Sequence, residues 1–148
     1  MVLQIKLVSY PETWEDIHQI RSIVYQKEQG VDPQLEFDGR DKTAKHFLAY
    51  LDGQAVGTTR IRNLDGKRAK IERLAVLKTA RKKGIGTKLM AQALAFLTEE
   101  GYQEVVIHAQ AYIKKLYEKM GFVQVGESFL EAGIPHVKMT IGINSSTR

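Results

Sequence analysis

One segment, residues 71–90, constrains this chain more than any other. Its first part, Ile71–Leu77, is rich in apolar residues and predicts a strand, and the motif Arg81-Lys-Lys-Gly84-Ile-Gly86 then opens an apolar helix. Glycine lets a backbone come close to a ligand, and the first N–H groups of a helix have no partner inside it. The segment therefore predicts a loop that binds a phosphate or pyrophosphate between a strand and a helix.

Other phosphate motifs do not fit this segment. A P-loop requires Gly-x4-Gly-Lys-Ser/Thr, which does not occur, and a dinucleotide fingerprint requires a third glycine where this chain has Leu89. A plain turn with solvated lysines is the structural alternative. The formal net charge of +5 favours anionic ligands. Part of that charge is gathered around the two glycines, at Lys78, Arg81, Lys82, Lys83 and Lys88.

Hydrophobic periodicity predicts the element order β-α-β-β-β-α-β-α-β-β. Thr13 with Asp16 resembles a capping box for the first helix, and residues 31–42 are expected to form a loop. The order predicts an α/β layer with a mostly antiparallel sheet, in one domain over residues 1–148. The last five residues, 144–148, are expected to fray. The expected strands are 4–8, 47–51, 54–61, 69–77, 105–107, 122–125 and 136–143. The expected helices have their apolar residues within 14–25, 89–97 and 113–120 and end at Gly30, Gly101 and Gly121.

Composition excludes several classes of protein. The chain has no cysteine, which rules out disulfides, thiolate metal sites and cysteine nucleophiles. No apolar run approaches the ~18 residues that span a bilayer. Residues 1–6 lack the basic start and apolar middle of a signal peptide. A cytoplasmic location is therefore expected.

Two motifs resemble those of a known superfamily. Residues 71–90 resemble motif A of the GNAT acetyltransferases, Gln/Arg-x-x-Gly-x-Gly/Ala, and Gln110–Phe122 resembles their motif B, which ends in Tyr-x3-Gly-Phe. The resemblance implies the GNAT fold, a mixed and mostly antiparallel sheet flanked by helices, and acetyl-CoA as the donor, without a metal. It places acetyl-CoA on Leu74, Ala75, Val76, Arg81, Lys82, Lys83, Gly84, Ile85, Gly86 and Thr87.

The resemblance also suggests catalytic residues, each with a structural alternative. Tyr117 matches the superfamily's general acid near the CoA sulfur, or it packs in the core. His108 stands where related enzymes have a carboxylate that orients the nucleophile. It could accept a proton near neutral pH, or it is structural. Glu72 could act as a base through water, or it is solvated. A backbone N–H near Ala75 and Val76 is expected to stabilise the oxyanion.

Four shorter segments narrow the resemblance to an ElaA-like and YjcF-like bacterial subfamily. They are Glu28–Val31, Asp38–Asp41, His108–Gln110 and Gly133–His136. We interpret the last as a turn that places His136 at the acceptor side rather than as paired strand. The candidate acceptor-binding residues are Glu28, Glu36, Asp38, Gln110 and His136, with Glu131 as a further acidic candidate.

Several functions agree with these features. The first is an N-acetyltransferase that acts directly on a primary amine of a small polar molecule. The alternatives are a protein or peptide N-acetyltransferase and a non-catalytic CoA-binding module, which would retain Gly84 and Gly86 without needing Tyr117. Nucleic acid is not an expected partner, because the chain lacks an interleaved aromatic and basic motif. A homodimer is possible on this reading.

Overall fold

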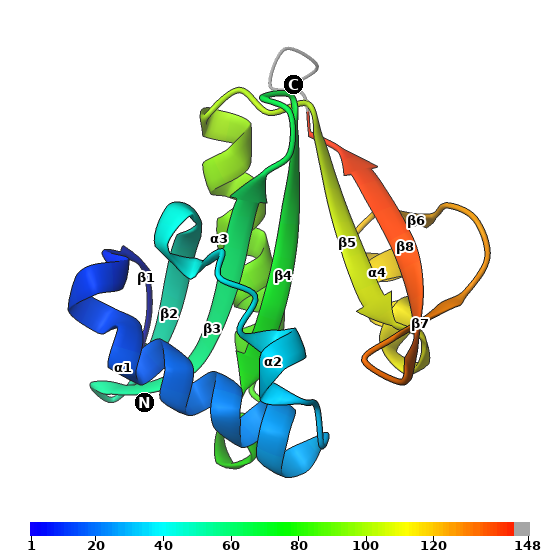
Figure 1. Ribbon diagram of the computed structural model, residues 1–148. Helices are drawn as coiled ribbons and strands as arrows, with labels where there is room; N and C mark the ends of the chain where they lie inside the picture. Colours follow the sequence, from blue (N-terminus) through cyan, green and yellow to red (C-terminus); the bar gives the residue numbers. More distant parts are fainter. Residues whose placement is uncertain (144–148) are drawn as a thin grey trace. The chain divides into compact units, whose positions relative to one another are not determined.

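The computed structural model describes residues 1–143 (Figure 1), so the predicted frayed tail lies outside the described residues. The chain forms two compact units, which are described separately. The first contains Met1–Arg62 and Ile71–Ala93, and the second contains Asn63–Lys70 and the chain from Leu94 onward. The single domain over residues 1–148 stays a prediction.

The first unit contains strands β1 to β4 and helices on both sheet faces. The strands are β1 (Leu3–Val8), β2 (Lys45–Leu51), β3 (Gln54–Asn63) and β4 (Arg68–Val76), and β1, β2 and β3 pair antiparallel in that order. The last residue of β3 and the first three residues of β4 belong to the second unit, and α3 (Ile85–Glu99) also continues into it. The order of these elements agrees with the prediction.

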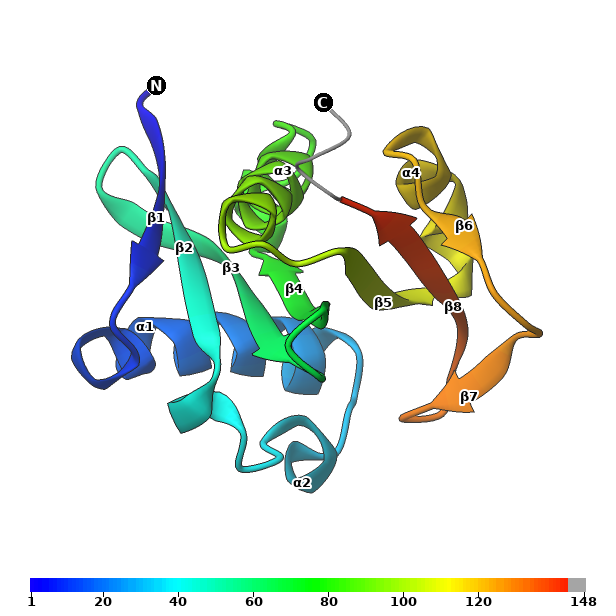
Figure 2. The same ribbon diagram turned by 90° about the horizontal axis from the view of Figure 1, so that it is seen from above.

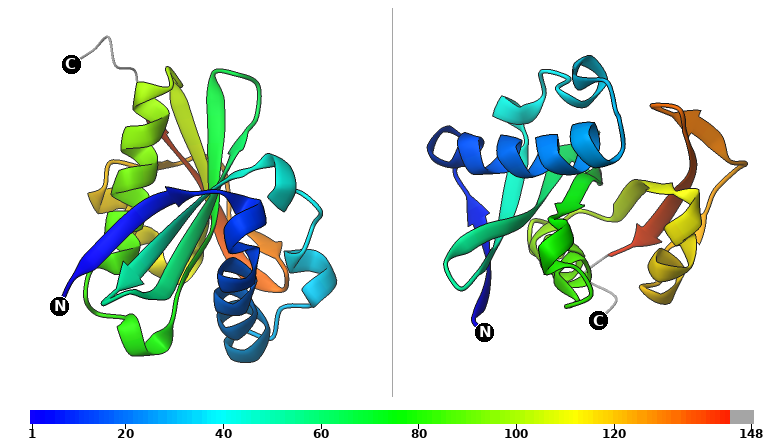
Figure 3. Two further views of the ribbon diagram at one scale, coloured as in Figure 1. Left: turned by 90° about the vertical axis from the view of Figure 1, so that its left-hand side faces the viewer. Right: turned by 90° about the horizontal axis from the view of Figure 1, so that it is seen from below.

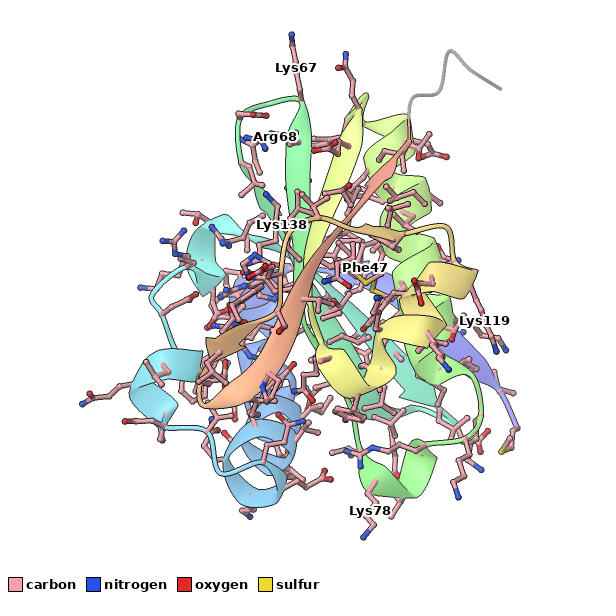
Figure 4. The ribbon with its side chains drawn as sticks, turned by 90° about the vertical axis from the view of Figure 1, so that its right-hand side faces the viewer. Phe47, Lys67, Arg68, Lys78, Lys119 and Lys138 are labelled. Atoms are coloured by element: carbon pink, nitrogen blue, oxygen red, sulfur yellow. The ribbon has the colours of Figure 1, made fainter. Side chains whose placement is uncertain are left out.

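Helix α1 (Tyr10–Arg21) and the start of α3 cover opposite faces of these strands (Figure 2). Ile17, Ile20 and Val24 pack on Leu48, while a Cβ at Gly57 would lie 3.1 Å from Leu89 on the other face. Gly57 therefore allows α3 to approach the sheet closely. Phe47 is also buried in this unit (Figure 4).

The first helical region ends before Gly30, as predicted, but differs from the prediction in its start and in the π-helical form of its second part. Helix α1 begins at Tyr10 with Ser9 as its N-cap, and Ser9 makes no side-chain cap bond. The predicted capping box is wrong, because Pro11 suits the first turn and starts the helix earlier. A π-helix, η1 (Ser22–Glu28), continues α1. The predicted loop contains two helical turns, α2 (Pro33–Glu36) and η2 (Asp41–Thr43).

The second unit contains the first residues of β4 and four further strands. Arg68–Lys70 pair in parallel with Glu104–Val106 of β5 (Glu104–Gln110), and β5 pairs antiparallel with β8 (Ile134–Gly142). Strands β6 (Val123–Gln124) and β7 (Phe129–Glu131) both pair antiparallel with β8. Helix α4 (Lys114–Lys119), which follows the turn η4 (Ala111–Ile113), contacts β5 (Figure 3).

The segment Gly133–His136 is not the unpaired turn that we expected. Ile134, Pro135 and His136 pair with Glu131, Leu130 and Phe129 in the β7–β8 hairpin. Proline is accepted there because the pairing of β8 with β5 begins only at His136, one residue later. Hairpin pairing, rather than an irregular turn, therefore sets the position of His136.

Candidate active site

The glycine motif forms the N-terminal end of α3. Gly84 has φ +74°, a conformation that L side chains rarely adopt. Its carbonyl accepts the N–H of Lys88 at 3.0 Å, so the N–H groups of Ile85, Gly86 and Thr87 precede the first helical bond. Lys78 lies in the loop before α3, and its side chain points outward (Figure 4). Lys82, Lys83 and Lys88 are also exposed. This helix end therefore offers backbone donors and positive charge to an anion.

Arg81 is occupied by partners within the chain. Its guanidinium holds Glu28 through two bonds of 2.7 and 2.9 Å, and its Nε donates to the carbonyl of Val76 at 2.9 Å. Arg81 was expected to bind the donor and Glu28 the acceptor, yet the structure pairs them with each other. The pair fastens the glycine loop to η1 and to the end of β4.

The end of β4 has an irregular backbone. Arg73 lies in the left-handed region at φ +55°, which interrupts the regular alternation of the strand. The carbonyl of Leu74 accepts the hydroxyl of Tyr25 at 2.7 Å, and Ala75 is buried. The expected oxyanion role of the backbone near Ala75 and Val76 stays a prediction.

Glu72 lies between two arginines. Its Oε2 accepts Nε of Arg60 at 2.7 Å and Nε of Arg62 at 2.6 Å, and Arg60 also contacts it through NH2. Glu72 is therefore not the solvated residue of the structural alternative, since only 8% of its side chain is exposed. To accept a proton, Glu72 would have to weaken these ion pairs.

Glu36 belongs to a buried ion pair and Asp38 to a partly buried one. Glu36 accepts Nε of Arg21 at 2.8 Å, and Asp38 accepts Arg60 through two bonds of 2.8 Å. Burial opposes the charge of Asp38. The hydrogen bonds from Arg60 and from the Arg40 backbone, together with the charges of Arg60 and Arg73, outweigh burial and lower the pKa of the carboxyl below its usual range. Together these pairs form a network that we call the arginine–carboxylate cluster. Its members are Arg21, Arg60, Arg62, Arg73, Glu36, Asp38, Asp41 and Glu72.

Sequence reasoning missed this cluster. Glu36, Asp38 and Glu72 were each predicted to be functional residues, but the arginines that neutralise them were not predicted to be their partners. The available signal was the alternation of Arg60 and Arg62 on a strand, which places both side chains on one face. Their partners lie in the loop before β2 and on β4, so only the tertiary structure joins them.

Tyr117 is buried on α4, with 6% of its surface exposed, and its ring packs edge-on against Phe122. Burial raises the pKa of Tyr117 to about 12, and Tyr112 adds to this effect. The phenol therefore remains protonated at neutral pH, as a proton donor requires.

His108 forms a group with two residues of the β7–β8 hairpin. Its Nδ1 lies 2.9 Å from Oε1 of Glu131, whose other oxygen lies 3.7 Å from Nε2 of His136. The hydrogen bond from His108 lowers the pKa of the Glu131 carboxyl, which burial opposes. Gln110 pairs with His136 across the β5–β8 ladder. The structure therefore brings together His108, Gln110 and His136, and adds Glu131.

Comparison with known proteins gives the family. A family model for the acetyltransferase (GNAT) domain matches residues 18–143. YjcF of Bacillus subtilis, named an uncharacterized N-acetyltransferase, is 33% identical over 129 residues, which cover 86% of this chain and 91% of YjcF. The chain therefore belongs to the GNAT acetyltransferase family and is an acyltransferase.

Solved structures agree with this assignment. An acyl-CoA N-acyltransferase from Pseudomonas aeruginosa is 30% identical, with a TM-score of 0.83 over 94% of this chain and 99% of that one. Escherichia coli ElaA is 26% identical, with the same TM-score and the same coverage. The predicted fold and the resemblance to the ElaA-like and YjcF-like proteins are confirmed.

Residues 1–143 contain neither a membrane-spanning helix nor a group of metal-ligating side chains. None of the helices described there is long and apolar enough to cross a membrane. In the same residues, no three His, Cys, Asp or Glu side chains are grouped to hold a metal ion.

Proposed function

We propose that this protein transfers the acetyl group of acetyl-CoA directly to a primary amine of a small polar molecule. The observation that carries the proposal is the N-terminal end of α3. There, the backbone N–H groups of residues 85–87 stand beside exposed lysines in a chain of the GNAT family. This end suits the pyrophosphate of CoA because fixed N–H dipoles and positive charge both favour an anion. Arg81 contributes by holding the loop in place through Glu28 and Val76.

The reaction requires one proton acceptor and one proton donor. The amine nitrogen attacks the thioester carbonyl, the C–S bond breaks, and the amine loses a proton while the thiolate gains one. We assign the donor role to Tyr117, whose phenol is protonated at neutral pH. We assign the acceptor role to His108, because the oxygens of the alternative, Glu72, are engaged by Arg60 and Arg62.

Partly exposed polar groups in the second unit support a small polar acceptor. The side chains of His108 and Glu131 are 27% and 42% exposed, so a ligand can reach both. The charge on Glu131 suits a cationic or hydroxyl-bearing acceptor. Glu28, Glu36 and Asp38 are less suited to this role than expected, because arginines neutralise them.

A screen for CoA release tests the reaction. Purified protein with acetyl-CoA is offered small polar amines in one set and lysine-containing peptides in the other. Release that depends on small amines is expected. Release with peptides alone would replace the small acceptor with a protein acceptor, and acetyl-CoA binding without any acceptor turnover would favour a binding module.

Gly84→Asp tests the donor site. The change adds a negative charge where the phosphates are expected, and we expect affinity for CoA to fall at least tenfold, or ~1.4 kcal/mol, by calorimetry. No atom lies within 4 Å of a Cβ built at Gly84, so the loss would not come from a clash within the protein. Gly53→Asp is the matched control, because Gly53 has φ +84° and equal space in the β2–β3 hairpin. Undiminished CoA affinity in Gly84→Asp would refute the assignment of this loop.

A further inference from the structure

The group formed by His108, Glu131 and His136 has a defined pattern of protons. Oε1 of Glu131 lies 2.9 Å from Nδ1 of His108, and the pKa of the carboxyl is lowered, so Glu131 is ionised and can only accept. Nδ1 of His108 must therefore carry the proton. In the neutral ring this leaves the lone pair on Nε2.

His136 and Phe129, in the β7–β8 hairpin, flank His108 and Glu131. Nδ1 of His136 lies 2.7 Å from the carbonyl of Ile134, which can only accept, so the proton of the neutral His136 ring is also on Nδ1. The Phe129 ring stacks on His136 and meets His108 edge-on, with centroid distances of 6.1 and 5.1 Å. These contacts restrict both imidazole rings.

Other charged groups act on the same carboxylate. Lys70 of β4 lowers the pKa of Glu131 in addition to the two histidines, and Lys138 pairs with His108 across the β5–β8 ladder. The hydrogen bond from His108 and the charge of Lys70 both favour the ionised form of Glu131. Glu131 therefore remains an acceptor for His108 at neutral pH.

We propose that Glu131 is a positioning residue that holds His108 in the tautomer with Nε2 unprotonated, the form able to take a proton from the attacking amine. The proposal rests on the proposed function in its use of His108 as the base. A carboxylate that orients an imidazole in this way is a general solution for histidine bases, because the wrong tautomer presents N–H instead of a lone pair to the substrate.

The tautomer of His108 is measured directly by long-range ¹H–¹⁵N NMR at pH 8, without any substrate. The ring signal is assigned by its loss in His108→Asn. We expect the Nδ1–H form in the parent protein. In Glu131→Ala the Nε2–H form should predominate, since an unrestrained neutral imidazole in water prefers it. Glu127→Ala, at an exposed glutamate in the loop before the same hairpin, should leave the signal unchanged.

Kinetics separate positioning from a merely structural role. Glu131→Ala should lower kcat by about 10- to 100-fold, a part of what a general base contributes, with the KM for acetyl-CoA changed less than about twofold. Glu131→Gln keeps the volume of the side chain, so it replaces Glu131→Ala in these measurements if the alanine variant does not fold. Its amide nitrogen can donate to Nδ1, so it should give a mixture of tautomers and an intermediate kcat.

Two results would overturn the proposal. One is an NMR result: an Nε2–H tautomer in the parent or a tautomer that is the same in Glu131→Ala. The other is a kinetic result: a kcat equal to that of the parent although the tautomer is altered. Failure of the proposed function is distinguishable, since it would show as absent acceptor turnover in the parent while the NMR result stayed the same.

Discussion

Replacement of Arg60 by Met removes the guanidinium that joins three carboxylates of the arginine–carboxylate cluster. Arg60 is 1% exposed and bonds to Asp38, Asp41 and Glu72. Burial lowers the pKa of its guanidinium, but the hydrogen bonds that it donates to Asp38 and Glu72 and the negative charges of both outweigh burial and raise that pKa, so Arg60 stays charged. The intact cluster balances four arginines against four carboxylates. Each of the three carboxylates would keep another arginine partner, Arg62, Arg73 or Arg21, but three arginines would face four carboxylates, which leaves one negative charge of the cluster uncompensated.

Loss of one partner from a buried ion pair costs about 3–5 kcal/mol, because the remaining charge is desolvated without compensation. A domain has only about 5–15 kcal/mol of stability in total. At about 2–4 °C per kcal/mol for a chain of this size, Tm should fall by roughly 6–20 °C. Met is chosen because it retains the volume of the stem, which limits the loss of packing.

Urea unfolding followed by circular dichroism at pH 7 measures the change in the free energy of unfolding. Arg68→Met is the matched control, because Arg68 pairs with Asp65 at the exposed β3–β4 turn (Figure 4). That variant should unfold close to the parent midpoint, since exposed ion pairs add little stability. If Arg60→Met unfolds at the same midpoint as Arg68→Met, the cluster does not contribute as argued.

Two further predictions concern single side chains. Tyr117→Phe should retain CoA affinity and lower kcat by roughly 10- to 1,000-fold in steady-state assays, because only the hydroxyl is lost; an equal kcat would leave Tyr117 as a core residue. Burial lowers the pKa of His46 below its usual 6.5, so as pH falls through that value the unfolded chain takes a proton that the folded chain resists. Between about pH 7 and pH 5 the free energy of unfolding should therefore decrease, and His46→Gln should reduce that slope in urea titrations, while an unchanged slope would exclude His46 as its source.

The elements that sequence reasoning predicted well are those with a local cause. Turn pairs such as Asp52-Gly53 and the glycines around α3 act through the backbone of their own residues. For most elements, the predicted limits of the strand or helix therefore lie within a few residues of the observed limits. The predicted start of α1 was wrong, because the hydroxyl of Thr13 donates to the carbonyl of Ser9 instead of capping the helix.

The candidate site also has one part that local sequence predicts and another part that it does not. The motif that ends in Gly86 is a run of adjacent residues, and its N–H donors follow from helix geometry wherever the helix lies. Its sequence alone therefore indicated an anion site and the acetyltransferase family. The side chains of Glu36, Asp38 and Glu72 carry no such local signal, since a carboxylate can be solvated, catalytic or paired in any of these positions.

The sequence by itself determined most of the element order, though not α2 or β7, and it determined the family and the glycine loop, because periodicity, turn residues and contiguous motifs are local properties of the chain. Only the tertiary structure decided which charges meet. It paired Arg81 with Glu28, enclosed Glu72 between Arg60 and Arg62, and set Glu131 against His108. Each of these contacts joins residues at least ten positions apart, and their energy depends on burial and on the distance between charged atoms, which no local pattern encodes.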